Sequence, residues 1–288
     1  MSEYTATATI NNVPPRGSLL FGTDAVPEGS AFIFSFIADP VTNAFDPSSV
    51  DEASLQFAFN CGGGFSAFGG TNGISCKTAD NGTIAVAGQI RDKDGGVGTS
   101  SGTMIVTNVA PTATFTATPQ IFQGESATLA FSQQVDPSPA DTTAGFTYAY
   151  NCTASGTLTV ANNRAASATC KYPTTGTFTV GGAISDKDQG VTRYTASVTV
   201  ISPQQAASNL RTQVVALNLS ADRTSDLTGK IDNALQKLAQ GQKADAQKQL
   251  QDFIKKVNDL LGQKLITAAQ GQVLIDTANR IIASIAVS

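Results

Sequence analysis

The sequence of 288 residues contains no histidine and no tryptophan. Without histidine the chain cannot build a Ser-His-Asp triad or a Cys-His pair, and it lacks the commonest general base. The glycine-rich stretch Cys61-Gly-Gly-Gly64 has no P-loop lysine, so we interpret it as a flexible loop. Sugar binding usually relies on aromatic platforms, which are scarce with only 5 tyrosines. These absences predict that the protein is not an enzyme.

Long apolar runs are also missing, and positive charge is scarce in much of the chain. No stretch approaches the ~20 apolar residues of a membrane-spanning helix, so membrane insertion is not predicted. Residues 1–201 hold 8 basic and 15 acidic side chains, whereas residues 202–288 hold 10 and 7, which together give the net charge of −4. The acidic part argues against nucleic-acid binding. The lysines of the basic part are spread along it, which favours a solvated face over a binding patch.

The four cysteines fall into two pairs, Cys61 with Cys76 and Cys152 with Cys170. Zinc ligation is the competing interpretation, but two cysteines per domain and no histidine make a poor zinc site. Disulfide bonds are therefore expected, and they indicate an oxidising compartment, so the protein is secreted or on the cell surface. Because Met1–Tyr4 lacks the basic and apolar regions of a signal peptide, we expect a trimmed form or a fragment of a longer exported protein.

A stretch that occurs twice organises the rest of the chain. Cys76 and Cys170 lie 94 residues apart, and each begins a run that aligns with the other without a gap. Both runs pass through Gly-Thr to an Asp-Lys-Asp motif, which is residues 92–94 in the first copy and 186–188 in the second. A period of this length indicates a repeated domain, since solenoid repeats are shorter.

The repeat, with a change of composition after Pro203, divides the chain into four parts. We expect two antiparallel, immunoglobulin-like β-sandwiches of about seven strands at 13–108 and 109–201, and a helical bundle at 202–288. Residues 1–12 resemble the closing strand of a preceding repeat. That strand is a frayed remnant, pairs with an edge of its own sandwich, or completes a sheet in another molecule by β-augmentation.

The expected core strands carry aromatic residues on one face. In the stretch 55–61 of the first repeat, period-2 alternation places Leu55, Phe57 and Phe59 on the same side as Cys61. The stretch 146–152 of the second repeat repeats the pattern up to Cys152. Bonds Cys61–Cys76 and Cys152–Cys170 would therefore lie buried, and closing such loops stabilises a domain by roughly 3 kcal/mol. Asp39-Pro40 and Asp136-Pro137 are expected to end the strands before them.

Helical periodicity begins after Pro203. We expect a linker helix at about Gln204–Leu219, which together with three antiparallel helices makes a small bundle. The first of the three follows a Thr224/Ser225 cap and stops at Gly241, the second ends at Gly262, and Thr267 caps the third.

These patterns resemble two families. The motif Asn108–Ala113, a Gly-Glu turn, Asp-Pro, an aromatic strand and the Asp-Lys-Asp hairpin are similar to PKD-like modules, which are immunoglobulin-like domains of bacterial and archaeal exported proteins. The chain departs from that family where Phe57–Cys61 and Tyr148–Cys152 replace its aspartate-containing strand. The apolar spacing of Leu250–Val257 and Gly271–Ala278 resembles the FIMAH domain of exported bacterial proteins, which implies attachment or assembly.

The aspartates of the two Asp-Lys-Asp motifs are the main candidate metal ligands. Asp92, Asp94, Asp186 and Asp188, joined by Asp39 and Asp136, offer the oxygen atoms that Ca²⁺ prefers, and some PKD-like modules bind Ca²⁺. The competing interpretation is a turn in which the aspartates cap their own backbone, and we favour it. No cofactor is required, and calcium is the one candidate.

The sequence therefore predicts a non-catalytic extracellular protein with a structural, assembly or adhesion role, such as a surface stalk or filament component. The alternative is an accessory binding module of a secreted hydrolase or adhesin. Glycoside hydrolysis by paired carboxylates would need a cleft, which two sandwiches with short loops do not offer. Expected partners are other copies of the chain or other surface proteins, with polysaccharide as a further candidate.

Overall fold

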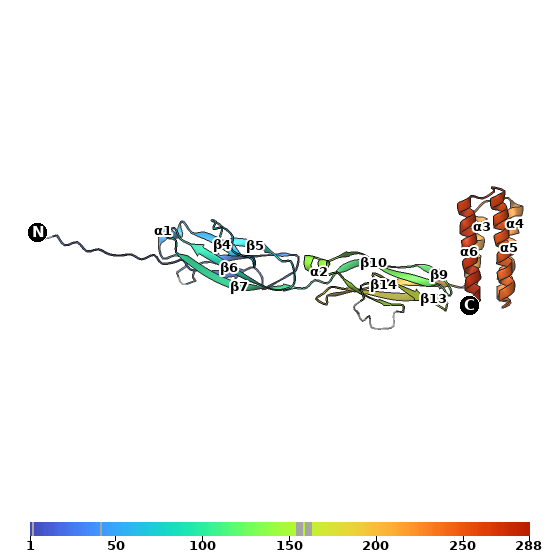
Figure 1. Ribbon diagram of the computed structural model, residues 1–288, viewed down its shortest axis with the longest axis horizontal. Coiled ribbons are helices and arrows are strands. Elements are labelled where there is room, and N and C mark those ends of the chain that lie inside the picture. The colour runs from blue at the N-terminus through green and yellow to red at the C-terminus, as the bar shows by residue number, and fades with distance from the viewer. Residues whose placement is uncertain (2, 41, 154–157, 159–162) are drawn as a thin grey trace. The chain divides into compact units, whose positions relative to one another are not determined.

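The computed structural model describes residues 1–288 except 2, 41, 154–157 and 159–162 (Figure 1). The chain forms two compact units, and their boundary runs through the second repeat. The first unit comprises Met1–Thr112, Val135–Phe146 and Ser185–Thr192. The second unit comprises Ala113–Gln134, Thr147–Ile184 and Arg193–Ser288.

The first repeat is a sandwich of two sheets. One has the order β1-β3-β5 and the other the order β2-β7-β6-β4, as labelled in part in Figure 1. Strand β2 pairs in parallel with β7, whereas β1, β3, β5, β4 and β6 pair antiparallel. Seven strands in two sheets confirm the predicted immunoglobulin-like sandwich. The strands are β1 (Ser18–Phe21), β2 (Ala25–Pro27), β3 (Ala31–Ile37), β4 (Gln56–Asn60), β5 (Gly73–Lys77), β6 (Gly82–Arg91) and β7 (Val97–Thr107).

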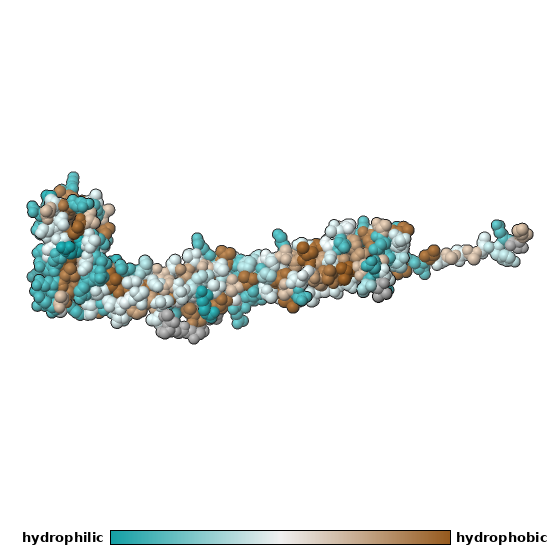
Figure 2. Space-filling view, turned by 180° about the vertical axis from the view of Figure 1, so that it is seen from behind, coloured by the Kyte–Doolittle hydropathy of each residue, from teal (hydrophilic) through white to brown (hydrophobic). Residues whose placement is uncertain are grey.

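Phenylalanines fill the core of this sandwich in the absence of tryptophan. Phe32, Phe34 and Phe36 alternate along β3 and are buried, and they face Phe57 and Phe59 of β4. The Phe34 and Phe59 rings meet edge to face with centroids 5.5 Å apart, a favourable geometry for aromatic pairs. Some outward side chains of the β1-β3-β5 sheet are also apolar, among them Leu20, Ile33 and Ile37. Hydrophobic colour is visible over this sandwich in Figure 2.

The second repeat has the same strand order. Its sheets are β12-β10-β8 and β11-β13-β14-β9, and β9 again pairs in parallel with the last strand, β14. Leu129, Val180 and Val198 are fully buried in its core. The strands are β8 (Thr112–Ala117), β9 (Gln120–Phe122), β10 (Ser126–Val135), β11 (Thr147–Asn151), β12 (Ser167–Lys171), β13 (Gly176–Ser185) and β14 (Val191–Ile201).

A short helix that the sequence did not predict precedes β4 and β11. These helices are α1 (Ser49–Glu52) and α2 (Pro139–Ala144). Their equivalence corrects the alignment of the two repeats: Asp46-Pro47-Ser48 leads into α1 as Asp136-Pro137-Ser138 leads into α2. Asp39 therefore does not correspond to Asp136, because the first repeat has a longer loop after β3.

Four helices follow: α3 (Pro203–Val215), α4 (Ala221–Ala239), α5 (Lys243–Gly262) and α6 (Ala268–Val287). The helix expected at about Gln204–Leu219 is present as α3, which ends at Val215, and its Leu210 and Val214 are fully buried in the same core as Phe253 and Ile281. The cap expected at Thr224/Ser225 is wrong, since α4 begins one turn earlier, after Ser220. The Thr267 cap is confirmed and forms a capping box with Gln270.

The N-terminal segment is not a strand. Residues 3–17 belong to no sheet, and the side chains of Tyr4 and Ile10 are each 93% exposed. The predicted alternation is present, but a single strand without a paired neighbour is unstable in water. Among the described helices, none combines the length and the apolar character needed to cross a membrane.

Candidate functional site

The two Asp-Lys-Asp hairpins use their first aspartate in the same way. Asp92 Oδ1 accepts hydrogen bonds from the amides of Asp94 (2.9 Å) and Gly96 (2.8 Å), and Asp92 Oδ2 accepts one from Asn12 Nδ2 (2.9 Å). Burial raises the pKa of Asp92, but the hydrogen bonds from Asn12 and these amides outweigh it, so the pKa lies below its ordinary value. Asp92 therefore fixes a turn and holds the segment that leads into its sandwich.

Asp186 repeats this arrangement in the second repeat. Its Oδ1 accepts from the amides of Asp188 and Gly190 (2.8 Å each), and its Oδ2 accepts from Asn108 Nδ2 (3.1 Å). A Cβ atom at Gly190 would lie 2.3 Å from Asp186 Oδ2, and one at Gly96 would lie 2.4 Å from Asp92 Oδ2. Glycine is therefore required where each hairpin closes.

The lysine between the aspartates forms ion pairs on both sides. Lys93 Nζ lies 2.5 Å from Asp94 Oδ2 and 3.1 Å from Asp51 Oδ1. Lys187 Nζ pairs with Asp188, with Asp80 Oδ1 (2.7 Å) and with Asp141 Oδ1 (3.2 Å). Hydrogen bonds to Asp188 and then to Asp80 raise the pKa of Lys187 above its ordinary value. This geometry supports the turn, and calcium bound by Asp92, Asp94, Asp186 and Asp188 stays a prediction.

The motif Asp-Pro-Ser-x-x-Asp, which leads into α1 and α2, supplies the other half of each arrangement. The amide of Asp141 donates to Ser138 Oγ (3.2 Å), and the amide of Ser138 donates to Asp136 Oδ1 (2.8 Å). In the first repeat, Asp51, Ser48 and Asp46 make the same two bonds. The side chain of Asp141 is thereby held inside the protein, with 0% of its surface exposed.

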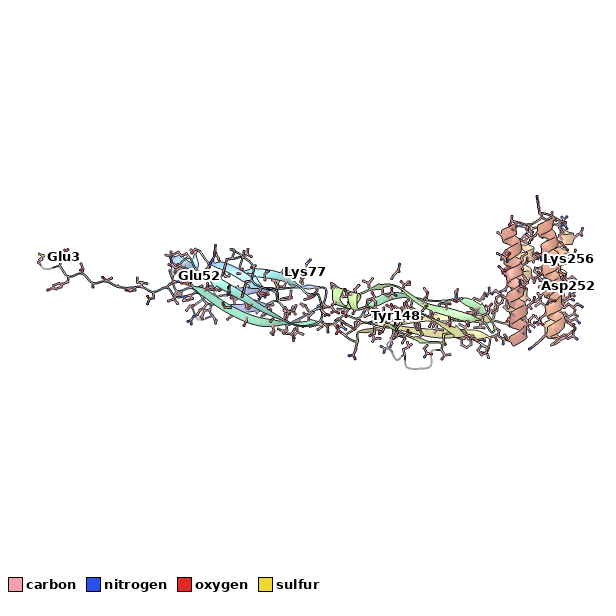
Figure 3. All side chains as sticks on the ribbon, viewed as in Figure 1. Glu3, Glu52, Lys77, Tyr148, Asp252 and Lys256 are labelled. Carbon is pink, nitrogen blue, oxygen red and sulfur yellow. A yellow bond between two sulfur atoms is a disulfide. The ribbon has the colours of Figure 1, made fainter. Side chains whose placement is uncertain are left out.

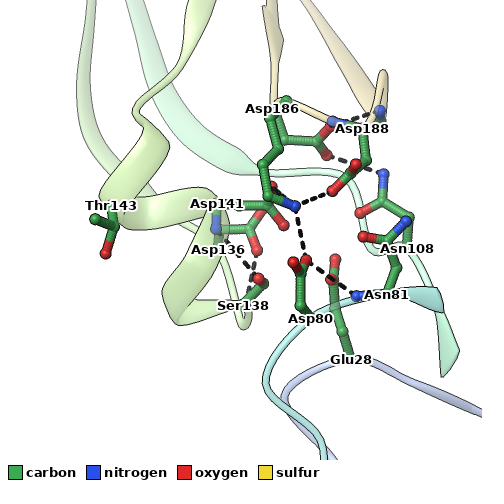
Figure 4. Close-up of polar contacts among 12 residues, drawn as sticks. Glu28, Asp80, Asn81, Asn108, Asp136, Ser138, Asp141, Thr143, Asp186 and Asp188 are labelled. Atoms are coloured by element: carbon green, nitrogen blue, oxygen red, sulfur yellow. Dashed lines mark hydrogen bonds and ion pairs between the residues drawn. The ribbon is translucent and has the colours of Figure 1, made fainter. Parts of the chain in front are cut away.

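Within the first unit, the α2 end of the second repeat contacts the first sandwich, which Figure 4 shows in close-up. Ser138 Oγ donates to the carbonyl oxygen of Ala79 (2.9 Å), and the amide of Val109 donates to Glu28 Oε1 (2.8 Å). Gly29 has a φ of 72°, and a Cβ there would lie 2.5 Å from Pro137. We call these contacts, together with Lys187–Asp80, the joint.

The joint concentrates buried negative charge. Glu28 is 2% exposed, and one oxygen each of Glu28, Asp136 and Asp141 lie within 4.8 Å of one another. Burial, followed by the nearby charge of Asp141, raises the pKa of both Glu28 and Asp136 above their ordinary values. Sequence reasoning missed Glu28, Asp80 and Asp141; the recurrence of Asp-Pro-Ser-x-x-Asp would have indicated Asp141.

The equivalent end of the first repeat is open. Asp46 Oδ2 and Asp51 Oδ1 are buried there without a hydrogen-bond partner, although Lys93 pairs with Asp51. Beside them lies a hollow of ≈ 680 Å³, lined by residues 10–13, 46–48, 50, 51, 93 and 94. The α1 end of the first repeat is thus equivalent to the α2 end of the second repeat, which forms the joint.

Each repeat contains one disulfide bond between its two sheets. Cys61, which follows β4, is bonded to Cys76 of β5, and Cys152, which follows β11, is bonded to Cys170 of β12. Cys76 and Cys170 are 2% and 1% exposed. The bonds therefore lie at the core, where the sequence pattern expects them, and such bonds are typical of the oxidising cell exterior.

In the second unit the helices pack against the end of the second sandwich. Phe122 and Ile201 of the sandwich lie in the same apolar core as the helices. Arg280 of α6 forms two hydrogen bonds of 2.8 Å with Glu125 and lies over the Phe122 ring, 4.2 Å from its centroid. These bonds to Arg280 lower the pKa of Glu125.

Lysines of the helices pair with neighbouring acidic residues. Lys256 of α5 lies 3.3 Å from Asp226 of α4, and Lys255 lies 3.0 Å from Asp252; Asp252 and Lys256 are labelled in Figure 3. This arrangement supports the solvated face over a binding patch.

Comparisons with known proteins bear on the fold and the helical part. The family model of the FIMAH domain matches residues 205–283, which confirms that resemblance. No curated protein sequence matches the chain. Among solved structures, the chain is similar to fibronectin(III)-like modules of Clostridium thermocellum CbhA, with 13% identity, a TM-score of 0.26, and coverage of 64% of this chain and 94% of that one.

Two animal proteins are similar to the same extent. Murine CEACAM1b has 12% identity and a TM-score of 0.31, with coverage of 65% of this chain and 100% of that one. The insect immune protein hemolin has 12% identity and a TM-score of 0.35, with coverage of 67% and 49%. Likeness at this level does not bear on function, and the assignment of the two repeats to PKD-like modules stays a prediction.

Proposed function

Because the chain joins two immunoglobulin-like sandwiches to a FIMAH domain, we propose that it is a non-catalytic structural protein of the cell exterior. In this role the modules form a spacer, or stalk, within a larger surface assembly. The two buried disulfides support an extracellular location. The helical domain then serves attachment or assembly.

The main support for this proposal is that the same type of turn, with a glycine of positive φ, makes the contact at the end of each sandwich. Gly29 of the first repeat contacts Pro137 of the second, and the equivalent Gly124 of the second repeat contacts Val287 of α6. Both glycines have a positive φ, and both follow a residue whose amide bonds to the end of the last strand, Glu28 to Thr107 and Gln123 to Ile201. A binding module would not need such built junctions, whereas a spacer depends on them.

The open α1 end of the first sandwich is the proposed contact with a partner. This end carries Asp46, Asp51 and Lys93. They are arranged like Asp136, Asp141 and Lys187, the residues that contact the first sandwich at the joint. The occupant that fits is another immunoglobulin-like module that presents a glutamate–glycine turn and an aspartate, as Glu28, Gly29 and Asp80 do. We therefore assign this face to contact with another immunoglobulin-like module of the surface assembly.

The proposal is tested by the stiffness of the joint. Spin labels on genetically encoded amino acids at Lys77, an exposed residue labelled in Figure 3, and at Thr143, exposed on α2, both lie in the first unit. We expect a narrow distance distribution by pulsed electron spin resonance in the full chain. Gly29→Asn should broaden it, because asparagine tolerates the positive φ but its Cβ meets Pro137.

Gly95→Asn is the matched control, since Gly95 has a φ of 87° and nothing lies within 4 Å of its Cβ position. A wide distribution in the unsubstituted chain would refute the spacer. The accessory-module alternative is tested separately by retention of the full chain on insoluble cellulose, chitin and peptidoglycan. Specific retention on one of them would favour that alternative and overturn the proposal.

A further inference from the structure

We propose that Glu28, Asp136 and Asp141 form a binding site for a hard divalent cation, with Ca²⁺ preferred, and that the bound ion fastens the joint. The site shares Asp136 with the calcium ligands expected from sequence, but neither Asp-Lys-Asp motif contributes a ligand to it, and Glu28 and Asp141 are new. It uses one residue of the first sandwich and two of the α2 end of the second repeat, all within the first unit.

The first argument is that each of these carboxylates has a buried oxygen atom without a hydrogen-bond partner. Glu28 Oε1 is used by the amide of Val109 and Asp136 Oδ1 by the amide of Ser138. Their other oxygens, Glu28 Oε2 and Asp136 Oδ2, are buried without a hydrogen-bond partner, as is Asp141 Oδ2. Buried carboxylate oxygens are costly unless they are paired, hydrogen-bonded or bound to a metal. One oxygen atom of each of the three carboxylates lies within 4.8 Å of the other two, and this convergence indicates a shared cationic ligand.

The second argument is that the lysine of the joint is already engaged elsewhere. Asp80, Asp141 and Asp188 form the other acidic group, and Lys187 pairs with all three. Asp141 takes part in both groups, with Oδ1 towards Lys187 and Oδ2 unpartnered. Lys187 therefore pairs directly with the second acidic group, and it acts on Asp136 only through a weaker, longer-range attraction.

The donor set selects the kind of ion. All three ligands are carboxylates, which suit hard cations such as Ca²⁺, and there is no histidine or free cysteine to favour zinc or copper. Three side chains from two segments make an irregular ligand set, which Ca²⁺ tolerates better than Mg²⁺ does, with water completing the shell. Extracellular modules bind Ca²⁺ with dissociation constants of about 10⁻⁴–10⁻³ M, and we expect this range here.

The first repeat provides an internal control. Asp46 and Asp51 are the counterparts of Asp136 and Asp141, with the same capping bonds and the same lysine pairing. No third carboxylate joins them among the described residues, because the counterpart of Glu28 would have to come from another module. Asp51→Asn therefore removes the same kind of side chain as Asp141→Asn without touching the proposed site.

The experiment measures melting temperature of the full chain against Ca²⁺ from 0.01 to 10 mM after treatment with chelator, with equilibrium dialysis of ⁴⁵Ca²⁺ in parallel. We expect one bound ion per chain and a rise in melting temperature that saturates. Glu28→Gln and Asp141→Asn should each weaken binding by about tenfold or more, because the charge of the ligands sets the affinity. Asp51→Asn and Asp94→Asn should bind as the unsubstituted chain does.

A folding defect is distinguished by the melting temperature in EDTA. There Glu28→Gln should melt no lower than the unsubstituted chain, since it removes one of the facing negative charges. Absence of binding up to 10 mM Ca²⁺ would overturn the proposal. So would loss of binding in Asp94→Asn with retention in Glu28→Gln, which would instead place calcium at the hairpins. These results are independent of the stiffness test for the spacer.

Discussion

Removal of one disulfide should destabilise its own sandwich and leave the other unchanged. The change is Cys61→Ala with Cys76→Ala in the full chain, compared with Cys152→Ala and Cys170→Ala. The bonded cysteines are 15 and 18 residues apart. In the chain-entropy account a loop of this size contributes about 3 kcal/mol, and the small difference in length changes this by only about 0.2 kcal/mol.

Hydrogen exchange followed by mass spectrometry measures the opening free energy of each sandwich separately within one molecule. The long central strands β6 and β13 carry buried residues and should exchange only when their own sandwich opens. Loss of Cys61–Cys76 should speed exchange in β6 by about a hundredfold, which corresponds to about 3 kcal/mol. The other double variant should do the same in β13.

Two results would refute this reasoning. If one pair contributes several times more than the other, loop entropy does not determine the effect, because the two loops are of similar length and each bond has one buried and one half-buried cysteine. If both strands lose protection together in either variant, the sandwiches do not unfold as separate units. Peptides from the helical core around Phe253 serve as the reference for unaffected exchange.

Two further predictions concern the helical domain. Arg280→Met should destabilise its packing on the second sandwich by about 1–2 kcal/mol, from the ion pair and the stacking on Phe122, and a double-mutant cycle with Glu125→Gln measures the ion-pair part. Because the pKa of Glu125 is lowered in the folded state, this contribution is present above the ordinary value of 4.5 and is lost as pH falls through the folded value; Arg280→Met should abolish that pH dependence in thermal melts. Thr267→Ala should cost about 1 kcal/mol in chemical denaturation through loss of the capping box, whereas Ser220→Ala, at a cap without a side-chain hydrogen bond, should cost a few tenths. Equal effects of the two alanine substitutions would contradict the capping argument.

The architecture could be predicted from the sequence because its strongest patterns are local. Alternation of aromatic residues in β4 and β11, and apolar spacing in α5 and α6, each specify one buried face. Residues 3–12 alternate like a closing strand but pair with no sheet, because alternation does not provide a neighbouring strand; the frayed remnant and β-augmentation stay predictions. The apolar spacing of α3, which includes Leu210, likewise predicted a helix of the bundle, but it did not indicate which side chains this helix packs against.

The joint could not be predicted because its residues come from positions that are distant in sequence. Glu28 and Asp141 are 113 positions apart, and nothing near Glu28 distinguishes it from a surface glutamate in a turn. Only the fold shows that this turn is covered and that the carboxylate is buried. The hairpin aspartates were easier to find, because their roles depend on neighbours within four residues.

The shared turn at Gly29 and Gly124 has an evolutionary consequence. One turn accepts the start of a sandwich and the other accepts the end of a helix, although the two structures have nothing in common. A gene encoding such a chain can therefore gain or lose whole repeats by duplication or deletion between the last strand and the helices. The number of sandwiches can then vary among descendants of one ancestor while the terminal helical domain is kept.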